Sequence, residues 1–134
     1  MPKISEYFFR SAILFLIAGI AIGLHMSISQ NHNAVGAHAH INLLGWVSSA
    51  VFGGYYALNP AKAEGLLPKV HYWLFTIGVV VMGGSLYMLL QGNAGMEPIV
   101  AVSSLAVAAG VLLAAVIIWM PAGSSSRLAA QPAE

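Results

Sequence analysis

Apolar residues gather in four long stretches of the chain, at about 9–29, 36–58, 70–91 and 98–120. Each stretch approaches or exceeds the ~20 residues that a helix needs to cross a bilayer. Short connections rich in Asn, Pro, Gly and Ser separate them, and such residues typically end helices. The pattern therefore predicts an all-α membrane protein with four transmembrane helices in one domain, residues 1–120. The small and polar residues 121–134 predict a disordered C-terminal tail.

Composition agrees with a membrane protein. Of the 134 residues, 59% are hydrophobic and 7% are charged, whereas soluble domains are about 25% charged. The net charge of +1 leaves no basic patch for nucleic acid. The absence of cysteine excludes disulfides, iron–sulfur clusters and covalently attached c-type haem. A metal would have to be held by nitrogen or oxygen, and the five histidines are the main source of such ligands.

Positive charges predict the orientation in the membrane. In a four-span arrangement all five lie on one side: Lys3, Arg10, Lys62, Lys69 and Arg127. Because cytoplasmic loops carry the excess of Lys and Arg, both termini are expected in the cytoplasm, with the protein in a bacterial inner membrane. Lipid is therefore one expected partner.

Small residues occur at helical spacing in two of the apolar stretches. They form the patterns Gly19-x-x-x-Gly23 and Ala106-x-x-x-Gly110-x-x-x-Ala114. Such spacing lets helix backbones approach closely in lipid. Four helices of this size enclose little space alone, so much of this surface is expected to serve an oligomer.

Four histidines are predicted to lie at the outer membrane level, and they are His25, His32, His38 and His40. An ionisable residue in a span is costly and usually has a partner, so the cluster indicates a metal or haem site. The alternative is that each histidine bonds backbone or water at a helix end. His71, at the opposite boundary, is interpreted as an interfacial histidine.

His38 and His40 are separated by about 200° around a helix axis and should serve two different sites. The face below His38 carries small and polar residues that suit a protein interior, namely Asn42, Gly45, Ser49, Gly53 and Tyr56. The face below His40 is apolar, as a haem edge would require. Trp46 lies roughly 15 Å into this helix. Its depth favours packing against a buried partner or planar cofactor, with plain helix packing as the alternative.

The segment from Val35 to Trp46, Val-Gly-Ala-His-Ala-His-Ile-Asn-Leu-Leu-Gly-Trp, resembles part of haem–copper oxidase subunit I and the nitric oxide reductase large subunit. In that superfamily the first histidine of His-x-His binds the high-spin haem and the second binds the low-spin haem. The resemblance implies these roles for His38 and His40. The family subunit has twelve helices in three arcs of four, so it also implies that this chain is one arc of a homotrimeric twelve-helix ring.

The first hypothesis is thus a homotrimeric haem b protein that acts in electron transfer or in oxygen or nitric oxide chemistry. If it is an enzyme, it is an oxidoreductase. Its redox partner is unidentified. Its expected haem-site residues are His38, His40, Asn42 and Trp46. Each haem would take His40 from one chain and His38 from the next, with His25 close by. A second hypothesis is a copper or zinc protein that uses His25, His32, His38 and His40. A third is an assembly subunit without a cofactor.

Overall fold

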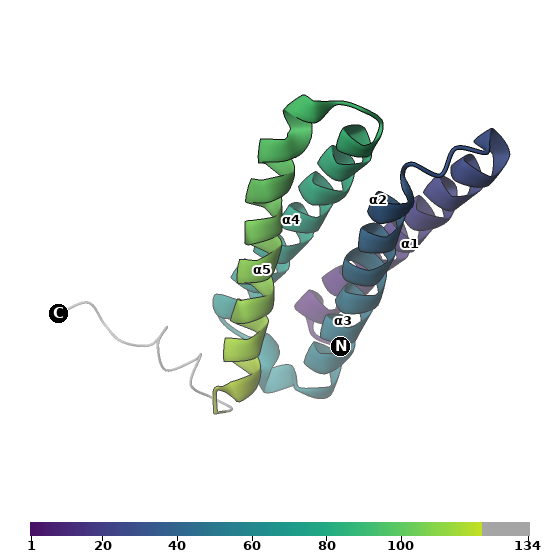
Figure 1. Cartoon of the computed structure of the whole chain (residues 1–134). Helices are drawn as coiled ribbons and strands as arrows, with labels where there is room; N and C mark the ends of the chain where they lie inside the picture. Colours follow the sequence, from purple (N-terminus) through teal and green to yellow (C-terminus); the bar gives the residue numbers. More distant parts are fainter. Residues whose placement is uncertain (122–134) are drawn as a thin grey trace.

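The computed structural model describes residues 1–121, and every regular element in that part of the chain is helical (Figure 1). The elements in order are α1 (Lys3–Ser29), α2 (Val35–His40), the π-helix η1 (Ile41–Ser48), α3 (Ser49–Leu58), the short helix η2 (Pro60–Ala63), α4 (Leu67–Leu90), the short helix η3 (Ala94–Met96) and α5 (Glu97–Trp119). Three stretches are long and apolar enough to cross a membrane: α1, α4 and η3 with α5. The all-helical prediction is confirmed. The predicted tail falls almost wholly on residues 122–134, outside the described part.

The second long helix changes type along its length. A plain helix was expected over 36–58, but α2, η1 and α3 follow one another directly, with π-type turns in the middle. Buried residues recur every fourth position through this stretch, at Ala37, Ile41, Gly45, Ser49 and Gly53. In an α-helix each four-residue step overshoots a full turn by about 40°. The wider i→i+5 turns of η1 offset this drift, and Gly45 and Gly53 both face α1, where a Cβ would meet Phe15 and Phe8 respectively.

The helices pack as two neighbouring pairs, α1 against the helix formed by α2, η1 and α3, and α4 against α5 (Figure 1). Glycines allow the close approach of the second pair. A Cβ on Gly110 would lie 3.1 Å from the Cα of Phe75, and a Cβ on Gly78 would lie 3.1 Å from the backbone nitrogen of Val107. The small-residue pattern around Gly110 therefore packs α5 against α4 of the same chain, which leaves less of it for an oligomer than expected.

The start of α1 belongs to the core although it precedes the apolar stretch that begins near residue 9. Ile4, Ser5 and Phe8 are buried there, and the Ser5 hydroxyl donates to the Gly53 carbonyl oxygen at 2.7 Å. The hydroxyls of Ser11 and Tyr72 are 2.8 Å apart. These contacts tie α1 to both α3 and α4.

One end of the bundle, here called the lysine end, carries Lys3, Lys62 and Lys69. The Lys62 ammonium donates to the carbonyl oxygens of Ile117 at 2.6 Å and Ile118 at 3.2 Å, and also to that of Met120. These carbonyls at the end of α5 have no partner within the helix, so the bonds hold the α3–α4 connection against α5. Arg127, the positively charged residue nearest the C-terminus, lies outside the described residues.

Candidate functional site

His38 lies on α2 with its ring against the glycine pattern of α1. Its Nδ1 is 2.9 Å from the carbonyl oxygen of Gly19, and a Cβ on Gly23 would lie 3.1 Å from the ring carbon Cε1. A carbonyl oxygen only accepts hydrogen bonds, so Nδ1 carries a proton, and in the neutral imidazole Nε2 then holds the lone pair. The contact with α1 thus fixes both the orientation and the tautomer of this imidazole.

Asn42 lies one turn beyond His38 and fills the space above Gly19. A Cβ on Gly19 would come within 2.5 Å of its amide atoms. The amide Nδ2 donates to the His38 carbonyl oxygen at 2.8 Å, while it is 3.4 and 3.5 Å from the two ring nitrogens, too far for strong bonds. Asn42 therefore holds the backbone that carries His38. Gly19 and Gly23 allow close helix approach by making room for these two side chains.

His40 is oriented by its own helix and is exposed. Its Nδ1 is 2.8 Å from the carbonyl oxygen of Gly36, one turn earlier, which again leaves the lone pair on Nε2. Apolar residues further along the same helix, Val47, Val51 and Leu58, are exposed as well. His38 faces α1 and His40 faces outward, so the two rings diverge as helical geometry predicts.

Trp46 is 37% exposed within the single chain. It lies in η1, two turns from the histidine pair. Its indole is therefore open to a second chain, to lipid or to a flat ligand, and the chain itself supplies no full enclosure for it.

His25 and His32 do not join the pair. Both are exposed, and Gly23 on α1 is the residue that contacts the His38 ring. Two residues on, His25 is turned by about 200°, so the Gly19 carbonyl occupies the place expected for His25 beside His38. Within residues 1–121 no group of three or more His, Cys, Asp or Glu side chains is placed to hold a metal ion. One chain does not gather the four histidines around a common centre there.

His71 is fully buried, which corrects its interpretation as an interfacial residue. Because α4 already begins at Leu67, His71 lies one turn inside the helix and faces α1 and α3. Its Nδ1 is 2.9 Å from the Tyr56 hydroxyl. Phenylalanine rings surround it, with centroids 5.0 Å away for Phe8 and 4.7 Å for Phe52.

The second ring nitrogen of His71, Nε2, is buried and has no hydrogen-bond partner in the described part of the protein. The ring of Phe52 stands edge-on to the imidazole at an interplanar angle of 81°. Sequence reasoning missed the contact between His71 and Tyr56, although it placed Tyr56 on the interior face of its helix. Since the connection from α3 to α4 is short, residues near its two ends were candidates for contact.

The chain matches no family model, no curated protein and no solved structure. The chemistry of His38 and His40 is consequently the main observation that bears on function.

Proposed function

We propose that the chain is a haem b-binding integral membrane protein in which His38 and His40 supply axial ligands to haem on opposite sides of one helix. The observation that carries the proposal is the hydrogen bonding of the His38 and His40 imidazole rings. Each imidazole has its Nδ1 on a backbone carbonyl, of Gly19 for His38 and of Gly36 for His40. Each therefore presents Nε2 as a lone-pair donor.

This donor set fits haem iron. A metal-ligating histidine normally donates its other ring N–H to a carbonyl, carboxylate or water, which fixes the tautomer and raises the basicity of the ligating nitrogen. Neutral imidazole is a common axial ligand of haem. Both rings meet these requirements before any ligand is added, whereas His71 has its Nδ1 on a hydroxyl and its Nε2 enclosed by apolar rings.

The surroundings of the two rings suit different tasks. His40 is exposed, and the same helix also exposes the apolar side chains of Val47 and Val51, which could cover one face of a macrocycle and keep water from it. His38 is half-buried, and Asn42 and Gly19 fix its backbone and ring. When bound, haem supplies one-electron redox chemistry and an iron site for oxygen or nitric oxide. The protein residues orient the ligand nitrogens and exclude water.

Assembly of several copies belongs to the same proposal. His40, Trp46 and the apolar surface below them are exposed in one chain, and a neighbouring copy in a homotrimer would cover them. Each haem would then lie between two chains and take one ligand from each. The helix formed by α2, η1 and α3 crosses the membrane as the fourth span, and both termini are cytoplasmic.

Absorption spectroscopy of the purified protein tests the cofactor. A Soret band with split α and β bands on reduction is expected from the wild type, and both His38→Ala and His40→Ala should abolish its bis-histidine form. His32→Ala is the matched control, because His32 is exposed in the α1–α2 connection. A spectrum unchanged by either of the first two variants contradicts the shared-ligand arrangement. Bound copper or zinc without a Soret band would instead support the metal-site alternative.

Cysteine labelling tests the four-span topology. Ala61 in the α3–α4 connection and Asn31 in the α1–α2 connection are both exposed and lie at opposite ends of the bundle. In intact cells an impermeant thiol reagent should label Asn31→Cys and spare Ala61→Cys. Equal labelling of both variants, or labelling of Ala61→Cys alone, contradicts the proposed orientation.

A further inference from the structure

The lysine end of the bundle contains a cavity of about 560 Å³ between the start of α1 and the start of α4, with three charged residues in its lining. Lys3 and Tyr7 line it from α1, Lys69 and Trp73 line it from α4, and Glu64 lines it from the connection before α4. Aromatic residues beside lysines are typical of the water–lipid boundary of membrane proteins. The cavity is thus placed where lipid head groups lie.

The charges of this cavity favour an anion. Lys3 and Lys69 bring two positive charges to the lining and Glu64 brings one negative charge. Neither lysine forms an ion pair in the described part of the chain, where the salt bridge is between Arg10 and Glu6. Lys3 and Lys69 also lie in the first turns of α1 and α4. Unsatisfied backbone N–H groups at these helix starts add partial positive charge.

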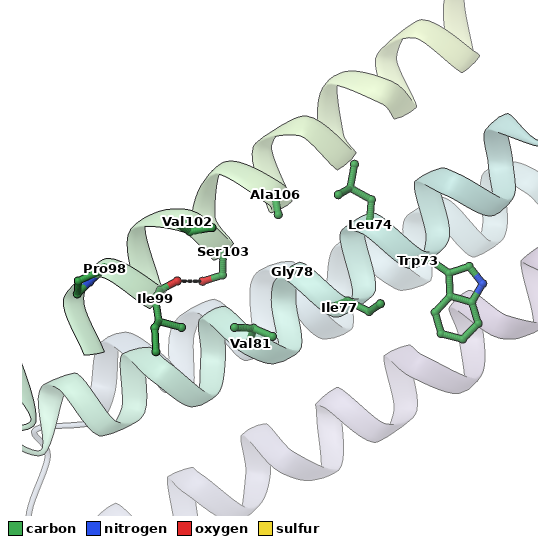
Figure 2. Close-up of a pocket in the computed structure, with 10 residues that line it drawn as sticks. All are labelled: Trp73, Leu74, Ile77, Gly78, Val81, Pro98, Ile99, Val102, Ser103 and Ala106. Atoms are coloured by element: carbon green, nitrogen blue, oxygen red, sulfur yellow. Dashed lines mark hydrogen bonds between the residues drawn. The ribbon is translucent and has the colours of Figure 1, made fainter. Parts of the chain in front are cut away.

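A second cavity adjoins the first at Trp73. It is an apolar groove of about 570 Å³ along α4 and α5, and Trp73 lines both cavities. Figure 2 shows Trp73 at one end of the groove, with Ile77, Val81 and Val102 further along. The two cavities therefore lie on either side of the Trp73 side chain, one with charged residues in its lining and one apolar.

The dimensions match one membrane leaflet. Along α4, Lys69 and Trp73 are separated by about 6 Å and Trp73 and Val81 by about 12 Å, at 1.5 Å per residue. Half of a typical hydrocarbon core is about 15 Å. The groove is therefore long enough to hold most of one acyl chain of a lipid whose head group lies at the lysine end.

We propose that these two neighbouring cavities bind one anionic phospholipid, with its phosphate at Lys3 and Lys69 and one acyl chain passing the Trp73 side chain into the α4–α5 groove. Basic pockets between transmembrane helices on the cytoplasmic side bind such head groups in other proteins. Glu64 opposes the anion and limits its affinity. The site is remote from His38 and His40, so it does not depend on the proposed haem function.

Native mass spectrometry of the detergent-purified protein, titrated with phosphatidylglycerol and phosphatidylcholine, tests the site. Phosphatidylglycerol should bind more tightly than phosphatidylcholine, and the double variant Lys3→Gln with Lys69→Gln should weaken its binding about thirtyfold. Glu64→Gln should strengthen it about threefold, because the opposing charge is lost. Arg10→Gln is the matched control, since it removes a positive charge outside the cavity and should leave binding unchanged.

A separate variant tests whether an acyl chain occupies the apolar groove. Val102 is exposed in the groove, so Val102→Trp should obstruct the acyl chain and weaken phosphatidylglycerol binding while the protein stays folded. Inorganic phosphate serves as the probe for a head-group site alone. Phosphate binding with no effect of Val102→Trp on the lipid would show a free-anion site and overturn the phospholipid assignment. Equal binding of the two lipids, or equal losses in the lysine and Arg10 variants, would overturn it as well.

Discussion

The two histidine regions of this protein have opposite surroundings. At one end of the bundle, the His38 and His40 rings donate to backbone carbonyls and keep a ring nitrogen available. Near the lysine end, His71 is sealed among aromatic rings and bonds the Tyr56 hydroxyl. Backbone carbonyls of glycines orient the His38 and His40 rings, whereas packing against aromatic rings holds His71 in place.

This difference means that ligand binding and folding stability should depend on different histidines. A ring that rests on glycine and a carbonyl can be removed with little loss of packed surface. A ring enclosed by Phe8, Phe52 and Phe75 fills core volume, and its loss leaves a cavity. Substitutions in the two regions should therefore change different measurements.

The largest loss of stability is expected from His71→Ala. The substitution leaves a cavity among aromatic rings and an unpaired Tyr56 hydroxyl, so the free energy of unfolding should fall by about 3 kcal/mol. Thermal denaturation in detergent measures the change. Wild-type stability in this variant would mean that the ring is not part of the core.

A smaller but more selective effect is expected from Gly19→Ala. The new methyl group would displace the Asn42 amide, at a cost of about 2 kcal/mol, and would disturb the His38 ring. The haem spectrum should change together with the melting temperature. Gly54→Ala is the matched control, because nothing lies within 4 Å of a Cβ at that position. Equal effects of both variants would contradict a specific role for Gly19.

Tyr56→Phe should reduce stability by about 1 kcal/mol, because Nδ1 of the buried His71 ring loses its partner and, like Nε2, is left unpaired while the ring packing remains. The double variant with His71→Ala should lose less than the sum of the single variants, since the two side chains share one hydrogen bond. Strict additivity in thermal denaturation would show that the bond contributes nothing.

The smallest change in stability is expected from His40→Ala, below about 0.5 kcal/mol, because the side chain is exposed and bonds only its own helix. The same variant should abolish the bis-histidine spectrum. A large drop in melting temperature in cofactor-free protein would place His40 in the packed structure and weaken its assignment as a ligand.

The sequence by itself determined the helical class, because long apolar stretches leave few other ways to satisfy backbone groups in lipid. It also determined that His38 and His40 diverge, since two residues on one helix are turned by about 200°. The interior face through Gly45, Ser49 and Gly53 followed from the same periodicity, and these residues are buried.

Only the tertiary structure decided which groups lie opposite these faces. The Gly19 carbonyl rather than His25 orients His38, α4 rather than a second copy meets Gly110, and His71 is enclosed rather than interfacial. The π-type turns of η1 likewise follow from contact with α1 along the whole helix. The physical reason is that periodicity fixes the direction of a side chain within its own helix, whereas its partner depends on how separate helices are aligned and rotated against one another.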